Sequence, residues 1–361
     1  MAKIDEFLKS LMERKGSDLH LCSDLPPKIR VHGRLEALEK QPAIPPEQMR
    51  DILHEICPEE KWQHYCTNLD MDFAYELRGL ARFRVNYMHN HYGPGAVLRI
   101  IPTKILTIED LNLPLVLKEI CAYPSGLVLV TGPTGSGKST TLAAMMDYIN
   151  VNFAKHIVTI EDPIEFVHRN KTSIVVQREV GSDTDSFSAA LKGAIRADPD
   201  IILVGEMRDL ETISLALTCA AMGMLVFGTL HTNNAPKTVD RIIDAFPADE
   251  QPQIRAMLAQ SLAAVVSQLL CRTPDGRGRV AVHEILLSHE ALASTIREGQ
   301  ISNIRSIIEQ FSGRGMKLMD NDLMRLLNEG RIPPIEAYMK ASNKREFEKF
   351  LGKGDLEQQL T

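Results

Sequence analysis

The sequence lacks several features that mark particular classes of protein. None of its six cysteines belongs to a Cys-X-X-Cys pair, which argues against a zinc ribbon and against a secreted disulfide framework. Residues 1–18 lack the apolar core of a signal peptide and instead show the spacing of one amphipathic helix. The net charge is −6, without the basic excess of most nucleic-acid-binding domains. We therefore expect a reduced, cytoplasmic protein with no nucleic-acid partner.

One stretch, residues 212–230, is uncharged over a length that has to be weighed as a membrane span. Gly223 interrupts this stretch near its middle, and hydroxyl side chains are scattered along it. A buried helix followed by a buried strand therefore fits the stretch better than a membrane span does.

The length of 361 residues predicts two or three domains. After residue 125, short apolar runs alternate with stretches of helical period, as in a parallel sheet built from βαβ units. These strand-like runs are 127–131, 156–160, 173–177, 200–204 and 225–229. We divide the chain into a small α+β domain at 1–101, a linker with a short helix at 102–124, an α/β core at 125–288 and a helical region at 289–361.

Residues 132–140, GPTGSGKST, match the phosphate-binding pattern G-X-X-X-X-G-K-[ST], with a strand-like run before them and a helical stretch after them. The glycines let backbone N–H groups turn inward around an anion. Lys138 is expected to reach the β- and γ-phosphates, and the Ser139 hydroxyl to ligate Mg²⁺. We predict a nucleoside triphosphate site formed by Gly132, Pro133, Thr134, Gly135, Ser136, Gly137, Lys138, Ser139 and Thr140.

Hydrolysis needs one carboxylate near the metal and another near the attacking water. Glu206 follows the apolar run at 201–204, and Glu161 follows the run at 156–160. Both are candidates because they stand where a phosphate-loop fold supplies such groups, at the carboxyl ends of strands. A solvated loop is the alternative for each. His231 ends a third apolar run, where it is either structural or a sensor of the γ-phosphate.

Four motifs stand in order along the chain: GPTGSGKST, TIEDPIEF (159–166), ILVGEMRD (202–209) and GTLHT (228–232). Together with RFRVN (82–86), they resemble the secretion ATPase family that powers type II secretion and type IV pili. The segments SDLHL (17–21), PPKIRVHGRL (26–35) and QREVG (177–181) fit its retraction branch, the PilT-like proteins. The tetracysteine motif of the extension and secretion branch is not present in the sequence.

The resemblance implies a PAS-like α+β domain followed by a RecA-like P-loop ATPase domain, assembled as a homohexamer that uses ATP and Mg²⁺. Glu161 is then the water-activating carboxylate, Glu206 acts on Mg²⁺ and the water, and His231 belongs to the His box. Arg84 and Arg99 resemble the family's arginine fingers, although a solvated strand face is the alternative for Arg84. Arg99 also interrupts an apolar run, where a guanidinium requires an anionic partner such as a phosphate.

The resemblance further implies a motor that powers type IV pilus retraction, and so twitching motility, by disassembling pilin. Its expected location is cytoplasmic, peripheral at the inner face of the cytoplasmic membrane. An inner-membrane platform protein resembling PilC is the expected partner, and a paralogous pilus ATPase is a further candidate.

Two segments depart from the family pattern. Gly223-Met224-Leu225 stands where the family usually shows GHL, and ALASTIRE (291–298) replaces AIRNLIRE, which is associated with retraction. These departures leave an accessory PilU-like ATPase, or a weakly hydrolysing regulatory ring, as alternatives. A RecA-like DNA motor is a further alternative, which the acidic balance and the lack of an evident basic-aromatic groove disfavour.

Overall fold

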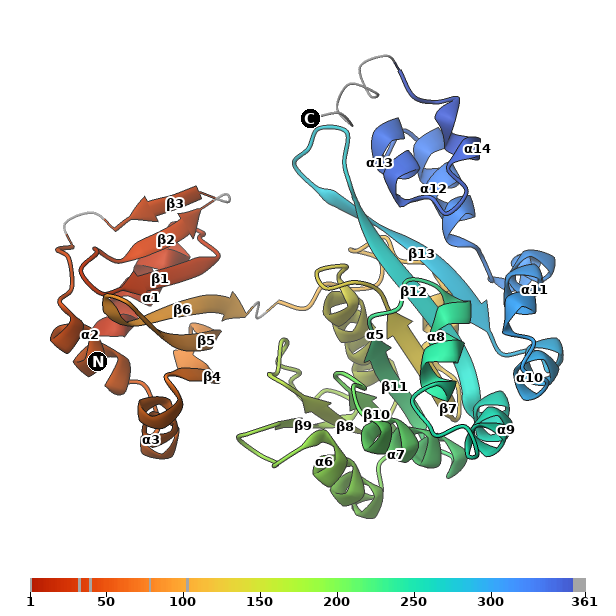
Figure 1. Cartoon of the computed structure of the whole chain (residues 1–361), viewed down its shortest axis with the longest axis horizontal. Coiled ribbons are helices and arrows are strands. Elements are labelled where there is room, and N and C mark those ends of the chain that lie inside the picture. The colour runs from red at the N-terminus through yellow and green to blue at the C-terminus, as the bar shows by residue number, and fades with distance from the viewer. Residues whose placement is uncertain (1, 32–33, 39–40, 78, 102–103, 353–361) are drawn as a thin grey trace. The chain divides into compact units, whose positions relative to one another are not determined.

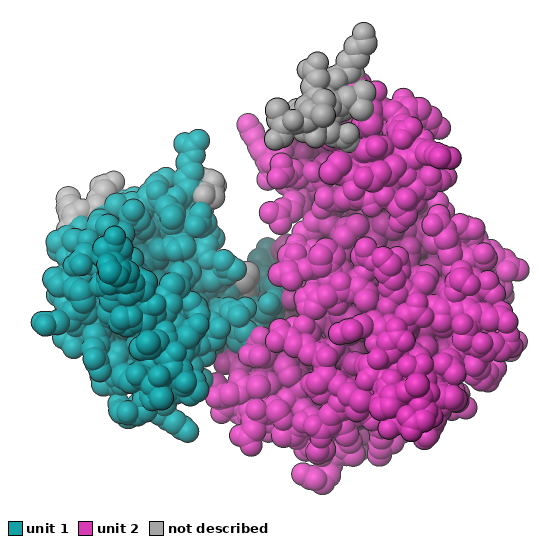
Figure 2. Space-filling view, in the orientation of Figure 1, with its two compact units in different colours: residues 1–104, 163–167 teal, residues 105–162, 168–361 magenta. Residues whose placement is uncertain are grey.

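The computed structural model describes residues 2–31, 34–38, 41–77, 79–101 and 104–352 (Figure 1). The chain divides into two compact units, which Figure 2 colours separately. Unit 1 comprises residues 1–104 and 163–167, and unit 2 comprises residues 105–162 and 168–361. The division into four segments drawn from the sequence stays a prediction. The sequence also predicts a turn between two strands at Gly33, a residue that lies outside the described ranges.

Unit 1 is an antiparallel sheet in the order β3-β2-β1-β6-β5-β4 with three helices packed on it. Its strands are β1 (Asp18–Cys22), β2 (Lys28–Val31), β3 (Arg34–Ala37), β4 (Asp70–Leu77), β5 (Ala81–Asn90) and β6 (Gly93–Ile101). Its helices are α1 (Lys3–Glu13), α2 (Pro46–His54) and α3 (Glu59–Asn68).

Period-2 alternation decides which face of the unit 1 sheet meets the helices. On β5, Phe83, Val85 and Tyr87 are fully buried, whereas Arg84 points to the other face and is exposed. The apolar stripe of α1 is also buried against this core. The helix confirms the sequence prediction for residues 1–18, and the alternation on β5 leaves the opposite sheet face free to carry charge.

Unit 2 is built on a seven-stranded sheet in the order β13-β12-β7-β11-β10-β8-β9. Its strands are β7 (Gly126–Thr131), β8 (His156–Glu161), β9 (Ile174–Glu179), β10 (Ile201–Val204), β11 (Leu225–Leu230), β12 (Leu262–Arg272) and β13 (Arg279–Leu287). Its α-helices are α4 (Val116–Cys121), α5 (Lys138–Asn152), α6 (Phe187–Ala194), α7 (Leu210–Ala221), α8 (Ala235–Ile243), α9 (Gln251–Ser261), α10 (Glu290–Arg297), α11 (Ile304–Gln310), α12 (Met319–Asn328), α13 (Pro334–Lys340) and α14 (Arg345–Glu348). Short 3₁₀ turns are η1 (Ile195–Ala197), η2 (Ile301–Asn303) and η3 (Ser312–Arg314).

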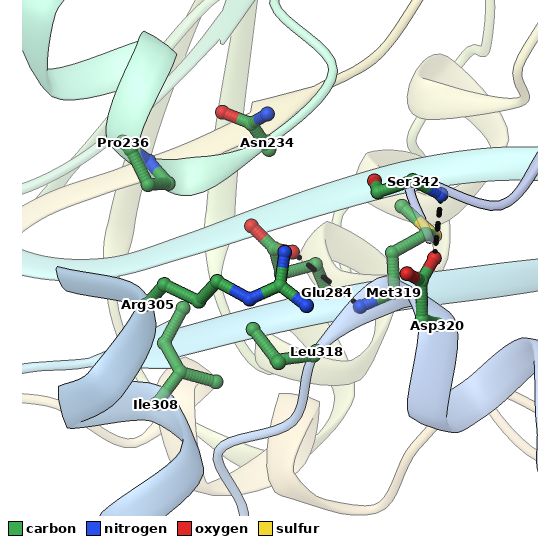
Figure 3. Close-up of a pocket in the computed structure, with 9 residues that line it drawn as sticks. All are labelled: Asn234, Pro236, Glu284, Arg305, Ile308, Leu318, Met319, Asp320 and Ser342. Atoms are coloured by element: carbon green, nitrogen blue, oxygen red, sulfur yellow. Dashed lines mark hydrogen bonds between the residues drawn. The ribbon is translucent and has the colours of Figure 1, made fainter. Parts of the chain in front are cut away.

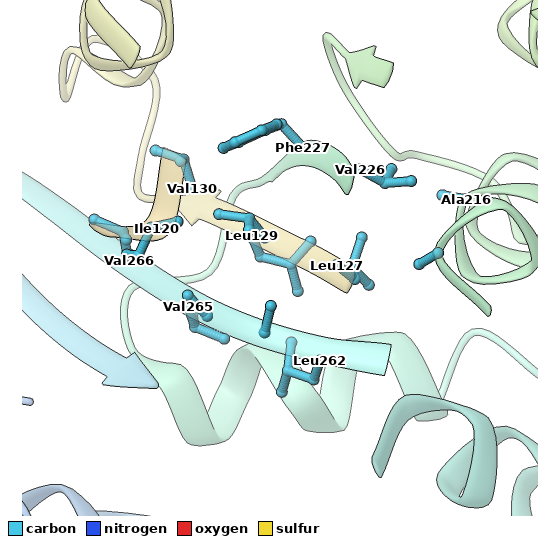
Figure 4. Packing of buried hydrophobic residues seen from close by; sticks show 14 of the residues in the cluster. Ile120, Leu127, Leu129, Val130, Ala216, Val226, Phe227, Leu262, Val265 and Val266 are labelled. Atoms are coloured by element: carbon cyan, nitrogen blue, oxygen red, sulfur yellow. The ribbon is translucent and has the colours of Figure 1, made fainter. Parts of the chain in front are cut away.

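The central strands of this sheet are buried on both faces, which explains their continuous apolar sequences. Every residue of β7, β10 and β11 is buried. Figure 4 shows Leu127, Leu129 and Val130 of β7 among apolar side chains of β11 and β12. All five strand-like runs predicted from the sequence are strands, and the stretch at 212–230 is a buried helix followed by a buried strand. The predicted α/β class is confirmed, and within the described ranges no helix combines the length and apolar character needed to cross a bilayer.

The hairpin of β12 and β13 was not predicted from the sequence. β12 runs parallel to β7, whereas β13 returns antiparallel to β12 and closes that edge of the sheet. The far end of the hairpin contributes Cys271 and Val282 to a separate apolar cluster with α12, α13 and α14. The hairpin therefore connects the central sheet to the C-terminal helices.

The segment expected to be a linker packs as part of unit 2. The predicted short helix is α4, and Leu117 and Ile120 on it are fully buried in the main core of the unit. Ile108 and Leu113, which precede the helix, belong to the same core. Residues 105–121 thus supply core side chains in addition to joining elements.

Candidate nucleotide site

The loop GPTGSGKST joins the end of β7 to the start of α5, as the motif requires. Gly132, Gly135 and Gly137 have φ angles of +147°, +78° and +86°, values that L side chains rarely adopt. The Lys138 ammonium donates to the carbonyl oxygens of Gly132 at 2.8 Å and Pro133 at 3.2 Å. The lysine therefore lies back over its own loop, with its ammonium group held by loop carbonyl oxygens.

The first and middle glycines of the loop differ in the space around them, which gives a matched pair of variants. A Cβ on Gly132 would lie 2.3 Å from the carbonyl oxygen of Gln268, whereas a Cβ on Gly135 would meet nothing within 4 Å. We expect Gly132→Ala to lower the free energy of unfolding by about 2–4 kcal/mol, because steric overlap adds to backbone strain. Gly135→Ala should cost about 1–2 kcal/mol from its φ angle alone. Denaturant titration of both variants tests this, and equal losses would contradict it.

The other predicted groups follow the strands beside β7. The parallel neighbours β7, β11, β10 and β8 all end at one edge of the sheet. The phosphate loop follows β7, His231 follows β11, Glu206 follows β10 and Glu161 is the last residue of β8. Parallel strands place ligands at their carboxyl ends, so the structure brings these residues to one edge as the sequence predicted.

Glu206 is the centre of a small charged group. One carboxylate oxygen accepts from Arg208 Nη2 at 2.6 Å, and the other lies 2.8 Å from His231 Nε2. The hydrogen bond from Arg208 is the main reason that the pKa of Glu206 lies below its ordinary value, and His231 adds to the effect. A carboxylate held ionised in this way is a hard oxygen ligand and an acceptor, as a group next to Mg²⁺ has to be. Sequence reasoning did not single out Arg208.

Glu161 is held by two side chains that the sequence did not identify. Its Oε1 accepts from Thr159 Oγ1 at 2.7 Å and from Gln177 Nε2 at 3.1 Å. Thr159 is two residues upstream on β8, and Gln177 belongs to the neighbouring β9. Gly205 lets the end of β10 approach, since a Cβ there would lie 3.3 Å from the Glu161 Cα. Gln177 lies in the QREVG segment, which was the available signal.

The two predicted arginine fingers lie in unit 1, directly opposite each other. The register of β5 and β6 pairs Arg84 with Arg99, so both guanidinium groups project from the exposed face of the sheet. Arg99 Nε donates to the buried carboxylate of Asp18 at 2.7 Å. The anionic partner that this strand position requires is therefore present within the chain as Asp18, and the apolar run by itself does not call for a phosphate. Two like charges opposite each other are unfavourable, and here Asp18 offsets the charge of Arg99 while Asp72 lies near Arg84.

A cavity of about 330 Å³ adjoins the phosphate loop within unit 2. Besides Thr134 and Gly135, its lining includes three cations, Arg272, Arg279 and Lys340, and one acidic residue, Glu336, which pairs with Lys340 at 3.3 Å, so positive charge is in excess. Its size is at the lower end of ligand pockets, and its charge favours an anionic ligand. Sequence reasoning missed these cations because they come from β12, β13 and α13, far from the loop in the chain.

Met224 stands where the family's GHL segment has its histidine. It lies at the amino ends of the parallel strands, away from the carboxyl ends that carry the phosphate loop. Met224 comes directly before β11, and the phosphate-loop edge lies six strand residues further on, about 20 Å away at 3.3 Å per residue. Its side chain packs against the main core. Position 224 is therefore remote from Lys138, Glu206 and His231.

These features define a P-loop nucleotide-binding protein. Parallel strands adjoin in one sheet, a glycine-rich phosphate loop follows one of them at its carboxyl end, and acidic residues stand at the carboxyl ends of neighbouring strands. The chain belongs to the type II/IV secretion system protein family, whose model matches residues 2–330.

Relatives extend over almost the whole chain. A "twitching motility protein" of Neisseria gonorrhoeae is 50% identical, covering 88% of this chain and 84% of its own length. The type IV pilus retraction ATPase PilT of Pseudomonas aeruginosa is 49% identical, covering 94% and 98%. The type IV pilus ATPase PilU of the same organism is 41% identical, covering 94% and 89%. A crystal structure of the pilus retraction motor PilT with bound ADP matches with a TM-score of 0.90 and 42% identity, covering 97% of this chain and all of that one.

Proposed function

We propose that this chain is a motor that hydrolyses ATP to power type IV pilus retraction by disassembling pilin. The observation that carries the proposal is the match, over nearly the whole chain, to the retraction motor PilT with bound ADP. The chain is an ATPase of the secretion family, and the residues after the parallel strands of its unit 2 sheet are the groups that we propose for ATP hydrolysis.

The proposed binding step uses the phosphate loop. Backbone N–H groups of residues 132–140 surround the phosphates, and Lys138 moves from its loop carbonyls to the β- and γ-phosphates. Ser139, in the first turn of α5, and Glu206 are the proposed Mg²⁺ ligands, and both offer the hard oxygen atoms that this ion prefers. Among the described residues, no group of three or more His, Cys, Asp or Glu side chains could hold a metal by itself. That suits a Mg²⁺ ion coordinated mainly by phosphate and water oxygens. When bound, the ion would neutralise negative charge on the phosphates.

In the proposed hydrolysis step, Glu161 accepts a proton from the attacking water. Thr159 and Gln177 fix one of its oxygens and so restrict the carboxylate to one orientation. His231 is hydrogen-bonded to Glu206, a proposed Mg²⁺ ligand. Loss of the γ-phosphate would therefore change the surroundings of both side chains.

The proposed assembly is a homohexamer in which Arg84 and Arg99 of one subunit approach the nucleotide of its neighbour. Cations at that position would stabilise negative charge on the transferred phosphoryl group. We further propose that the ring works at the inner face of the cytoplasmic membrane, on a platform protein of the PilC type. ATP then bridges neighbouring subunits of the ring. Its hydrolysis breaks this bridge and lets the subunits rotate relative to each other.

One observation keeps an accessory role in view. The altered segment ALASTIRE forms α10, in which Leu292 and Ile296 are buried while Arg297 is exposed. A third buried position on this helix is polar, because Thr295 stands where AIRNLIRE has a leucine, and the changes at Ala293 and Ser294 fall on half-buried positions. The higher identity to PilT than to PilU favours the main motor over the accessory form.

The test is deletion of the gene in its own host, followed by complementation. We expect retraction of labelled pili to stop and to return with the wild-type chain, and purified protein to release phosphate from ATP. Lys138→Ala should restore neither activity, because the loop then lacks its charge on the γ-phosphate. Retraction that persists after deletion, together with no turnover by the purified chain, would instead indicate the accessory ring. ATPase stimulation by DNA would support the DNA motor.

A further inference from the structure

A buried glutamine on β12 lies beneath the phosphate loop. The Gln268 side chain is 2% exposed, so both ends of its amide have to be satisfied within the protein. Its Nε2 donates to the carbonyl oxygen of Ser136 at 2.7 Å, and its Oε1 accepts from Thr141 Oγ1 at 2.7 Å. Ser136 belongs to the loop and Thr141 to the first turn of α5. One amide therefore bridges the loop and the helix that together enclose the phosphates.

Two glycines of the motif make room for this contact. A Cβ on Gly132 would lie 2.3 Å from the Gln268 carbonyl oxygen, and a Cβ on Gly137 would lie 2.9 Å from Gln268 Nε2. The loop is thus wrapped closely around residue 268. The preceding residue of β12 makes a second hydrogen bond at this place: Ser267 Oγ lies 2.8 Å from Oγ1 of Thr131, the last residue of β7 before the loop.

The orientation of the amide fixes the state of a buried histidine. The Ser136 carbonyl can only accept, so the amide nitrogen of Gln268 faces it and Oε1 faces the other way. His283, directly opposite Gln268 in the β12–β13 register, has Nε2 3.0 Å from that oxygen. His283 Nε2 must therefore carry the hydrogen. Burial lowers the pKa of His283 to about 3, so the ring is neutral.

The chain of contacts continues into the C-terminal helices. The backbone N–H of His283 donates to Asp322 Oδ2 at 2.9 Å, and Asp322 lies on α12. Its other oxygen accepts from Lys317 and Arg325, each at 2.9 Å. Burial opposes ionisation, but these two cations hold the pKa of Asp322 below its ordinary value. The carboxylate is thus a fixed anchor, and its side chain is 1% exposed.

The next residue of β13 makes a second connection to the same helix. Glu284 Oε1 accepts from the backbone N–H of Ala235, which begins α8, and Oε2 accepts from the N–H of Met319, which begins α12. Figure 3 shows Glu284 and Met319 facing each other in this way, with Arg305 beside them. β13 is therefore joined to α12 at two consecutive positions.

We propose that Gln268 is a positioning residue of the phosphate loop, and that through His283 and Asp322 it couples nucleotide binding to α12. This inference rests on the proposed nucleotide site. Phosphates that tighten the loop around Gln268 restrict the amide and the His283 ring, and through the backbone N–H of His283 they restrict the Asp322 carboxylate. Gln268, His283 and Asp322 are all buried, so water does not compete for the hydrogen bonds between them and a shift of one residue is passed to the next.

The experiment measures the affinity for a fluorescent ADP analogue, KM and kcat for ATP, and hydrogen exchange of α12 with and without ADP. Gln268→Met keeps the approximate volume but leaves the Ser136 carbonyl and the Thr141 hydroxyl without their partner. We expect KM and the dissociation constant to rise about tenfold or more, with a smaller change in kcat, because Glu161 and Glu206 are untouched. ADP should slow exchange in α12 of the wild type and not of this variant.

A second pair of variants keeps the proposal testable if Gln268→Met does not fold. His283→Gln retains a donor toward Gln268 Oε1, whereas His283→Leu removes it. We expect His283→Leu to weaken ADP binding and to abolish the protection of α12, and His283→Gln to restore both. A merely structural histidine would change the melting temperature in both variants without this rescue.

Lys138→Ala separates the two proposals. If it binds the ADP analogue as the wild type does, the nucleotide site itself is misassigned. If it loses binding while the Gln268 and His283 variants bind normally, the site stands and the positioning role is overturned. Wild-type protein that shows no ADP-dependent protection of α12 would overturn the coupling.

Discussion

Glu161→Gln is expected to lower kcat for ATP hydrolysis by about 10²- to 10⁴-fold, the range that a positioned general base contributes. The amide keeps an oxygen able to accept from Thr159 and Gln177, so the local structure should persist. It cannot take a proton from water. Nucleotide affinity should stay within about twofold, because the phosphates are held by the loop after β7. Phosphate release under saturating ATP and titration with labelled ADP measure the two quantities.

Asp162→Asn is the matched control for this prediction. Asp162 is the adjacent carboxylate, it is exposed, and it contributes charge toward Arg208. We expect it to retain most of the wild-type kcat. If Asp162→Asn loses as much activity as Glu161→Gln, or if Glu161→Gln remains active, then Glu161 is not the base.

Arg84→Ala is expected to lower kcat by about 10³-fold or more, as loss of an arginine finger does in other phosphate-loop enzymes. The Arg84 side chain is 46% exposed, and its Nε lies 3.9 Å from Asp72 Oδ1, too far for a hydrogen bond. An exposed ion pair of this kind contributes about 0–1 kcal/mol, so the variant should fold normally. Activity per protomer should rise with protein concentration for the wild type and stay near background for the variant.

Arg34→Ala is the control, because Arg34 is an exposed arginine on β3 of the same sheet. It should preserve both turnover and its concentration dependence. Turnover that is indifferent to Arg84 would remove the arginine-finger assignment. Arg99→Ala is less clean, because it also deprives the buried Asp18 carboxylate of its 2.7 Å partner and should lower stability as well.

Much of the fold was predictable because its signals are local. Five of the seven strands of unit 2 are short apolar runs, and such a run is recognisable when a strand is buried on both faces. Apolar and polar residues alternate over 82–87, and this local pattern matches the buried and exposed faces of β5. β12 and β13 escaped prediction, because β12 is apolar except for Ser267-Gln268 in its middle and Arg272 at its end, and β13 carries charges among its apolar residues. Whether such a segment is strand or helix is decided by what it packs against.

The sequence by itself determined the phosphate loop, since glycine spacing and a lysine set the backbone path within nine residues. It also determined that Glu161, Glu206 and His231 follow strands, and hence that they reach one sheet edge. Only the tertiary structure decided their partners. Gln177 contacts Glu161 from the neighbouring strand β9, and Gln268 contacts the loop from more than a hundred residues away in the chain. Asp18 of β1 pairs with Arg99 of the neighbouring strand β6. Hydrogen bonds depend on distance and direction in space, and for residues so far apart in the chain these are set by strand order and register.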